Sequence, residues 1–391
     1  MKSGGMTRAM KIPGKTGVSP PLDLDSGKYV RIWQGPQHPG ITGNMSLELI
    51  LEGDEVRQCT THVGYLHRGF EKLMERRRYI QCFPIVCRIC VPEPDFNEYL
   101  FAACAEELAG VETPERAAWI RALTLEMARL TSFLMWIGGQ AGSFGFGTVG
   151  QWTVTMRDYM LDLFEELSGG RIYHMYIVPG GVRGELPEGY ADTVEKVLKQ
   201  VEKVLRDVEL VLFNNAVFKS RAKKLGVITP EMIDYYGITG PNARACGVER
   251  DIRKDSPYLV YDRLDFDVVT GSESDAYERC LVRYREMHQS IDLIRQILRK
   301  MPEGPVHTPL PNVLHWKIPP GEVYLKSECT RGEYGYYMVS DGTGYPRRIY
   351  VRGPSYTHAV ALMEDLAVDV NIADIAGLMV SLHTYPPEIE R

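Results

Sequence analysis

The sequence has no second C-x-x-C motif to match the pair formed by Cys87 and Cys90. These two residues stand in the stretch QCFPIVCRICVPEP, with Arg88 between them. A C-x-x-C pair places two sulfurs on one side of a turn, which is half of a four-thiolate metal site. The other six cysteines are single, at positions 59, 82, 104, 246, 280 and 329. A complete metal site would therefore need distant histidines or carboxylates.

Motifs for nucleotide binding and hydrolysis are also missing. There is no Walker loop, no G-x-G-x-x-G after an expected strand, no G-x-S-x-G and no H-E-x-x-H. The loop GSFGFG at 142–147 lacks the Lys and Ser or Thr that complete a phosphate-binding loop. We therefore expect no flavin, nicotinamide or iron–sulfur site held by this chain alone. Electrons for any redox reaction would come from elsewhere.

Neither a signal peptide nor a membrane span is visible. The first 20 residues are basic and lack an apolar core. The stretch 130–156 carries no acid or base, but glycines interrupt it, so it predicts a core helix followed by a turn. The net charge of −6 argues against a nucleic-acid partner. If the protein works at a membrane, partners must hold it there.

The hydrophobic pattern predicts an α+β chain in four parts. Residues 1–28 form an extended tail and 29–68 a small β-rich region. A central bundle of long helices is expected over 69–301, where apolar residues recur at helical spacing. Within residues 302–391, segments that alternate like strands are separated by Gly-rich turns, which predicts β-hairpins. This part ends in an apolar helix and tail, and we expect it to pack on the bundle.

Individual elements follow from the same patterns. Strands are expected at 29–34, 45–52 and 55–62, with a loop at 35–44 that can bring His38 up to a site. A Thr113-Pro114 start predicts a long helix through about residue 137. The other expected helices are 69–80, 93–110, 148–167, 188–215, 276–300 and 359–382.

Three readings of Cys87 and Cys90 stay open on spacing alone. The pair can hold a metal, cycle between dithiol and disulfide, or simply be buried structural cysteines. Arg88 would favour a thiolate if its charge points toward the sulfur. Because a thiolate attacks sulfur–sulfur bonds, a substrate containing a sulfur chain suits this pair.

Several motifs together resemble one known family. In order they are GPQHPGITGNMSLEL (35–49), GYLHRGFEKLME (64–75), the CRIC segment, GGVRGELP (180–187) and the C-terminal EIER. The chain is identified as a member of the family that joins the large subunit of [NiFe] hydrogenases to the 49-kDa (D) subunit of respiratory complex I. The resemblance spans nearly the whole chain and implies a hydrogenase large-subunit-like fold.

The hydrogenase branch binds nickel and iron through an N-terminal C-x-x-C and a C-terminal D-P-C-x-x-C. Cys87 and Cys90 match the first pair. Tyr385 and Glu388 stand at the cysteine positions of the second, and His383 replaces the aspartate. With two of four thiolates missing, the resemblance implies no functional [NiFe] site and no metal bound by this chain.

The quinone-reducing branch lacks all four cysteines. Its members contact the quinone head with a histidine, matched by His38, and with a tyrosine. Aligned on Arg88, the tyrosine position is Ile85, which cannot donate a hydrogen bond. The missing donor argues against quinone reduction. A membrane-bound, quinone-reducing NADH dehydrogenase-like subunit is the alternative interpretation.

The half-retained cysteine set looks like a third branch, the large subunit of the archaeal membrane-bound sulfane reductase. This likeness implies reduction of polysulfide with electrons from ferredoxin, through [4Fe-4S] clusters in partner subunits. The partners would be a small subunit with the proximal cluster, other peripheral subunits, and antiporter-like membrane subunits that translocate ions. The chain would be peripheral, on the cytoplasmic side of the cell membrane.

The resemblance also assigns the site residues. The groups expected to act are Cys87, Cys90, Arg88 and His38. The side chains expected to line the pocket are Ile85, His383, Tyr385 and Glu388. A second alternative is a non-catalytic scaffold, in which the pocket is a relic and the subunit only couples a cluster to the membrane arm.

Overall fold

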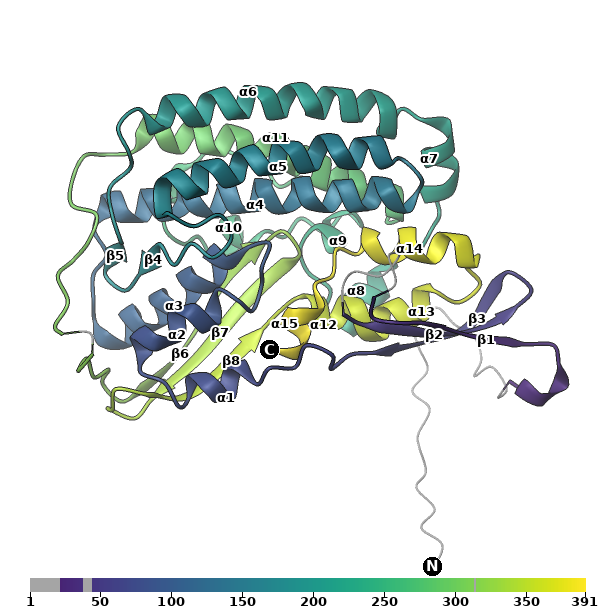
Figure 1. Cartoon of the computed structure of the whole chain (residues 1–391), viewed down its shortest axis with the longest axis horizontal. Coiled ribbons are helices and arrows are strands. Elements are labelled where there is room, and N and C mark those ends of the chain that lie inside the picture. Colours follow the sequence, from purple (N-terminus) through teal and green to yellow (C-terminus); the bar gives the residue numbers. More distant parts are fainter. Residues whose placement is uncertain (1–21, 38–43, 313) are drawn as a thin grey trace, which may run out of the picture.

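The computed structural model describes residues 22–37, 44–312 and 314–391. A layer of long helices lies over a three-stranded sheet and its covering helices, and a second three-stranded sheet extends to one side (Figure 1). The predicted α+β class, with a helix bundle, an N-terminal β region and C-terminal hairpins, is confirmed.

Four long helices make the upper layer: α4 (Glu115–Ser143), α5 (Gly147–Ser168), α6 (Tyr190–Val208) and α11 (Ala276–Lys300). α4 is buried along nearly its whole length, because α5 and α11 both pack against it. α6 is amphipathic and lies at the surface, with its valine and leucine stripe turned inward.

Two antiparallel sheets lie below this layer. The first consists of β1 (Val30–Gln34), β2 (Ser46–Glu52) and β3 (Glu55–His62), in that order. The second consists of β6 (Gly321–Cys329), β7 (Gly332–Ser340) and β8 (Pro346–Arg352), also in chain order. The tight turn between β6 and β7 lies beneath the long helices (Figure 1).

Three helices connect the first sheet to the bundle: α1 (Phe70–Met74), α2 (Tyr79–Val86) and α3 (Pro94–Ala109). The single helix expected over 69–80 is wrong, because the chain breaks between α1 and α2. Arg78 is extended there, and the backbone N–H of the next residue donates to the carbonyl of Gly344 on the second sheet.

The remaining elements are short. The strands are β4 (Ile177–Val178) and β5 (Gly181–Val182). The helices are α7 (Ala216–Ala222), α8 (Pro230–Tyr236), α9 (Pro241–Arg244), α10 (Ile252–Asp255), α12 (Ser355–Thr357), α13 (Met363–Leu366), α14 (Ile372–Ser381) and α15 (Pro386–Glu390).

Three predicted helices need correction. Pro114, not Thr113, is the residue before α4, and the helix runs six residues past the expected end at 137. Gly138 is part of this extension and lets α5 approach closely, since a Cβ there would lie only 3.3 Å from Gly150 Cα. The expected helix 188–215 ends as a π turn, and 359–382 is broken between α13 and α14.

Within the described residues, no helix has both the length and the apolar composition needed to cross a membrane.

Candidate active site

Cys87 and Cys90 lie where α2 turns toward α3. Cys87 is the residue that follows α2, and two backbone hydrogen bonds, Arg88 N–H to Ile85 O and Ile89 N–H to Val86 O, close the turn. Both cysteine side chains are fully buried, and neither forms a disulfide. The turn therefore presents two thiols to the interior of the protein.

A buried arginine from the β6–β7 turn contacts one of these thiols. Arg331 Nη2 lies 2.7 Å from Cys90 Sγ. The same guanidinium pairs with Glu93 Oε2 at 2.9 Å and with Glu388 Oε2 at 3.1 Å. All four side chains are fully or almost fully buried. A thiol, a guanidinium and two carboxyl groups thus form one cluster, called here the Arg331 cluster.

The C-terminal segment completes this cluster. Glu388 accepts hydrogen bonds from the backbone N–H of Ser355, at 3.0 Å, and from its hydroxyl. The backbone N–H of Tyr385 donates to the same hydroxyl at 2.9 Å. The Tyr385 ring centre lies 5.8 Å from the Arg331 guanidinium carbon. Ser355 therefore fixes both Tyr385 and Glu388 against Arg331.

Burial controls the protonation of the cluster. It raises the pKa of the Cys90 thiol well above its ordinary value, and the positive charge of Arg331 offsets this only in part. Burial also raises the pKa of Glu388, again against the opposing effect of Arg331. Both groups thus retain their protons to a higher pH than they would in water.

Arg88 favours the Cys87 thiolate, as expected for a charge that points toward the sulfur, but it does not outweigh burial. Arg88 Nη1 does reach Cys87 Sγ at 3.3 Å. Even so, burial is the larger effect and raises the pKa of Cys87 to about 12. Arg88 also donates to Pro84 O at 2.7 Å, and its guanidinium carbon lies 4.3 Å from the ring centre of Tyr173.

His383 lies at the edge of the Arg331 cluster. Its ring packs against Trp136, with centroids 5.5 Å apart, and its backbone adopts a left-handed φ of 51°. Burial, reinforced by the charges of Arg331 and Arg283, lowers its pKa well below the ordinary value. The imidazole is therefore neutral, and its Nδ1 has no hydrogen-bond partner within the described residues.

A second buried titratable cluster lies behind Cys87. His174 Nδ1 is 3.0 Å from both carboxylate oxygens of Asp95, and its ring stacks on Phe164 at 3.9 Å. Glu98 accepts backbone N–H bonds from residues 175–177. Burial and the charge of Asp95 raise the pKa of Glu98 to about 8. This acid can thus exchange a proton near neutral pH.

The comparisons with known proteins place the chain in a family. The model for the 49-kDa subunit of respiratory-chain NADH dehydrogenase matches residues 143–316 and 312–391. The D subunit of the NADH-quinone oxidoreductase of Thermosipho melanesiensis is 42% identical over 93% of this chain and 99% of its own length. The chain belongs to the 49-kDa subunit family.

Proteins of other complexes are similar to this member of the 49-kDa subunit family. The D subunit of the F420H2 dehydrogenase of Methanosarcina mazei is 38% identical over 94% of this chain and 99% of its own length. A chain from the structure of the membrane-bound sulfane sulfur reductase, an archaeal respiratory membrane complex, is 40% identical. It superimposes with a TM-score of 0.91 over 95% of this chain and 100% of its own.

These findings confirm the family resemblance, including the likeness to the sulfane reductase branch. They make the chain a subunit of a membrane-bound, respiratory-type oxidoreductase complex, and hence one of several subunits.

The Arg331 cluster does not suit the nickel–iron centre of the related hydrogenases. Among residues 22–37, 44–312 and 314–391, no three His, Cys, Asp or Glu side chains gather as a metal site needs. A guanidinium 2.7 Å from Cys90 Sγ places positive charge where a cation would bind. Glu388, for which the family resemblance predicts a cysteine position of the hydrogenases, already pairs with that guanidinium.

The structure brings together only some of the predicted site residues. Cys90, His383, Tyr385 and Glu388 surround Arg331. Cys87 and Arg88 contact each other on the turn that also holds Cys90. Ile85 is half-buried at the end of α2 and packs against the core. His38 lies outside the described residues, so its predicted role stays a prediction.

Sequence reasoning missed Arg331, Glu93 and Ser355. Arg331 contacts Cys90 from 241 positions away, and no spacing rule connects two such residues. One signal was present: the stretch CTRG places an arginine in the tight turn of an expected hairpin. An arginine there can reach inward without interrupting either strand.

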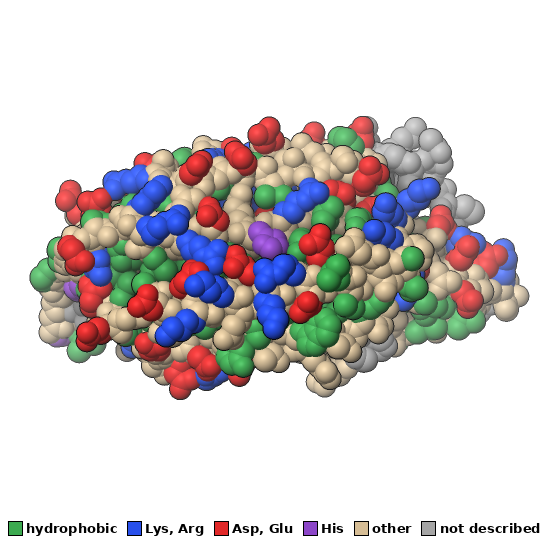
Figure 2. All heavy atoms as spheres, turned by 90° about the horizontal axis from the view of Figure 1, so that it is seen from above, with side chains coloured by type: hydrophobic (Ala, Val, Ile, Leu, Met, Phe, Trp, Pro, Cys, Tyr) green, Lys and Arg blue, Asp and Glu red, His purple; other side chains and the backbone are tan. Residues whose placement is uncertain are grey.

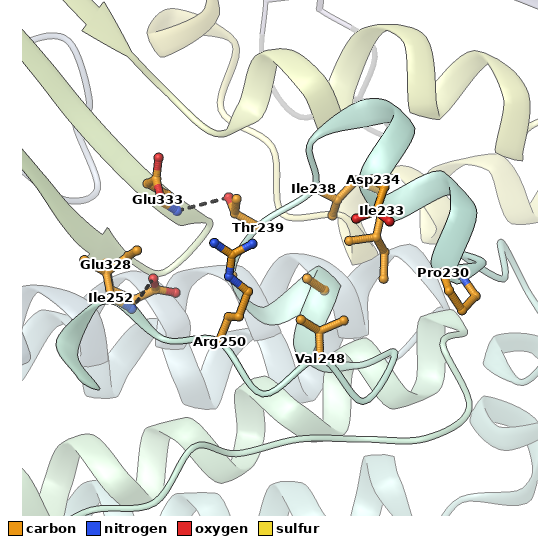
Figure 3. A pocket seen from close by; sticks show the side chains of 12 residues that line it. Pro230, Ile233, Asp234, Ile238, Thr239, Val248, Arg250, Ile252, Glu328 and Glu333 are labelled. Carbon is orange, nitrogen blue, oxygen red and sulfur yellow. Dashed lines mark hydrogen bonds between the residues drawn. The ribbon is translucent and has the colours of Figure 1, made fainter. Parts of the chain in front are cut away.

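A hollow of about 270 Å³ lies on the outer side of the β6–β7 turn. Figure 3 shows apolar side chains of α8 and its following loop on one side and Arg250, Glu328 and Glu333 on the other. The backbone N–H of Glu333 donates to Thr239 Oγ1 at 3.1 Å, which holds the turn from outside. None of the predicted site residues lines this hollow.

Proposed function

We propose that this chain is the catalytic subunit of a membrane-anchored, ion-translocating complex that reduces sulfane sulfur. Electrons would come from ferredoxin through [4Fe-4S] clusters in partner subunits, and the chain would form one wall of a cavity against the small subunit with the proximal cluster. It would lie on the cytoplasmic side of the membrane, held there by partners. The observation that carries the proposal is the contact of Arg331 with Cys90, next to Glu388, a carboxyl whose pKa is raised by burial.

The chemistry of the Arg331 cluster suits an anionic sulfur chain. Arg331 already pairs with Glu93 and Glu388, so it would hold an anion when one of these carboxyl groups carries a proton, which burial favours at Glu388. The protonated Cys90 thiol is a small, polarizable neighbour for sulfur. The likeness to the sulfane sulfur reductase chain, over 95% of this chain, supports this choice of substrate.

The reaction requires two electrons and one proton. The terminal sulfur–sulfur bond of a doubly charged polysulfide breaks, which gives a polysulfide one sulfur shorter, still doubly charged, and one hydrosulfide ion. The clusters of the partner subunit supply the electrons. In this chain Arg331 would hold the sulfur that gains charge, and Glu388 would release the proton to it.

Quinone reduction is the second candidate, because the relative from Thermosipho melanesiensis belongs to an NADH-quinone oxidoreductase. Against it stands Ile85, which occupies the position of the quinone-contacting tyrosine and has no donor group. A quinone reductase would also gain little from a buried thiol with an arginine against it. Under the scaffold reading, neither acceptor would react at the Arg331 cluster.

The experiment compares acceptors on the purified intact complex. Reduced ferredoxin is oxidised with polysulfide, protons or a quinone as acceptor, and nickel is measured in the same sample. The proposal predicts polysulfide-dependent sulfide release without stoichiometric nickel. Preferred quinone reduction, or stoichiometric nickel with hydrogen evolution, would reject it.

A variant pair separates catalysis from scaffolding. Cys87→Ala with Cys90→Ala should abolish sulfide release while the complex still assembles. The control is Cys104→Ala. This change also removes a buried thiol, but one that donates a hydrogen bond to the Tyr336 carbonyl at 3.6 Å and not one that contacts Arg331. Unchanged turnover in the double variant would favour the scaffold.

A further inference from the structure

A basic surface surrounds α1 and the turn between β7 and β8. The segments 71–78, 314–317 and 341–348 hold seven Lys and Arg residues against three acids. The chain as a whole carries a net charge of −6. Positive charge is therefore concentrated at this place, called here the α1 patch.

Contacts hold the three segments together. Arg78 Nη1 donates to the carbonyl of Leu314 at 2.6 Å, and its guanidinium carbon lies 5.4 Å from the ring centre of Tyr345. Arg348 pairs with Glu71 at 3.0 Å and with Glu75 at 3.1 Å. The α1 patch is thus one continuous surface, built on the outer face of β8.

Three arginines of the α1 patch are available to bind something else. Arg76, Arg77 and Arg347 are exposed, and their side chains make no hydrogen bond or ion pair within the described residues. Glu71 and Glu75, the nearest acids to α1, are already occupied by Arg348 and other cations. Asp341, the third acid of these segments, interacts with Arg347 only through the field of its charge and forms no close ion pair with it. An anion that approaches this surface therefore meets guanidinium groups that form no close ion pair within the described residues.

Apolar and aromatic side chains are interleaved with these cations. Leu73, Leu314, Tyr345 and Tyr350 are 36%, 54%, 41% and 38% exposed. Tyrosine favours the boundary between water and lipid, because its ring is apolar and its hydroxyl is polar. Arginine side chains can lay their apolar stems on such a surface while the charged ends reach the headgroups.

We propose that the α1 patch binds the anionic headgroups of the lipid bilayer. The chain is a subunit of a membrane-bound complex and shows no spanning helix within its described residues. Arginines next to exposed tyrosines and leucines match what a bilayer surface offers, which is negative charge over an apolar layer. The proposal does not depend on which acceptor the complex reduces.

The opposite side of the molecule looks different. α6 lies farthest from α1 in Figure 1, and Figure 2 shows basic and acidic side chains mixed on that upper face. Lys196, Lys203 and Arg206 on α6 are exposed, as are the three arginines of the α1 patch. They therefore provide a matched control with the same loss of charge.

The test measures how the full-length chain co-sediments with vesicles. Phosphatidylcholine vesicles are compared with a phosphatidylglycerol–phosphatidylcholine mixture, at low and high salt. The patch variant is Arg76→Gln, Arg77→Gln, Arg347→Gln, and the control variant is Lys196→Gln, Lys203→Gln, Arg206→Gln. A third variant changes the three patch arginines to lysine, which keeps the charge and checks that the fold tolerates substitution.

We expect the wild type, the control variant and the lysine variant to bind the anionic vesicles at low salt. The glutamine patch variant should bind roughly 100-fold more weakly, because each cation near an anionic surface contributes about a fivefold factor. An equal loss of vesicle binding in the control variant would overturn the proposal. A wild type that binds anionic vesicles no better than neutral ones would also overturn it. Loss of a partner subunit from the complex, with vesicle binding unchanged, would instead assign the α1 patch to an acidic protein.

Discussion

Arg331 is the residue on which the other groups of the site depend. It contacts Cys90, Glu93 and Glu388 at once, and all of these side chains are buried. A planar guanidinium can make these contacts in three directions, whereas an ammonium group binds as a point charge. The geometry of the cluster, and not only its charge, should therefore matter for activity.

The first prediction concerns Arg331→Lys. The charge stays, but the planar fork of donors is lost, so we expect kcat/KM for polysulfide to fall at least about tenfold in a complex that still assembles. Steady-state sulfide release measures this. Arg116→Lys serves as the control, since Arg116 pairs with Glu185 at the half-exposed start of α4. Equal effects of both changes would contradict a special role for Arg331.

The second prediction concerns the proton on Glu388. Because burial raises its pKa, the carboxyl is protonated at low pH and loses its proton as the pH rises through that value. Sulfide release should decline over the same range, by about tenfold per pH unit once the acid is ionised. Glu388→Gln, whose amide has no proton to give, should be slower and should lack this decline. A variant with the wild-type pH profile would assign the proton to another group, such as Glu98.

At the scale of elements, features that depend on neighbouring residues could be predicted from the sequence, and features that depend on distant residues could not. α11 begins and ends where its pattern predicts, because Asp275 caps its first turn and the stripe is regular. The break between α1 and α2 was not predictable, since the hydrogen bond from Tyr79 N–H to Gly344 O that accompanies it joins residues far apart in the sequence. The Cys90 turn could be read from sequence, but its arginine partner, 241 positions away, could not.

The β6–β7 turn, which carries Arg331, is clamped by the loop before α9. Gly240 has a φ of 69°, and a Cβ there would lie 2.3 Å from Gly332 Cα. The atoms that such a Cβ would meet belong to the backbone, so no flexible side chain can move to make room for it. The close approach of these two glycines therefore fixes the position of Arg331 from outside the site.

The third prediction follows from this clamp. Gly240→Ala should lower the free energy of unfolding by at least about 2 kcal/mol, from backbone strain and overpacking together. Denaturant titration of the chain measures the loss. Gly237→Ala is the control: its φ of 62° is similar, but open space surrounds its Cβ position, so only about 1 kcal/mol is expected. Equal losses would mean that the clamp adds nothing.

At the scale of the whole molecule, a buried ion network links the helix layer to the second sheet. Arg253 of α10 pairs with Asp251 at 2.7 Å and with Glu126 of α4 at 3.1 Å. Arg244 continues the network to Glu328 of β6 at 2.7 Å. Removing one partner from such a network leaves an uncompensated buried charge.

The fourth prediction is acid sensitivity that depends on Asp251. Burial opposes ionisation of this carboxyl, but Arg253 and Arg244 outweigh it and hold its pKa well below the usual range. Because the pKa of Asp251 is lower in the folded state, the ionised carboxylate stabilises the fold at pH values above the unfolded pKa of about 4. This stabilisation is lost as the pH falls toward the pKa of the folded state. Asp251→Asn should lower the free energy of unfolding by about 3–5 kcal/mol at neutral pH. The variant should also lose less of its remaining stability as the pH falls. Thermal unfolding against pH tests this, with the exposed Glu249→Gln as control.

The whole fold matches a hydrogenase-like large subunit, and an ion-paired cluster surrounds Cys90, one of the two cysteines that the family resemblance predicts at the metal position of the hydrogenases. The most direct measurement is the ferredoxin-driven rate of sulfide release by the intact complex, for the wild type and for Cys90→Ala. We predict rapid release from polysulfide in the wild type and a loss of at least about tenfold in the variant, with assembly unchanged. A wild type that reduces quinone but not polysulfide, or a variant that releases sulfide at the wild-type rate, would contradict the proposed role of the Arg331 cluster.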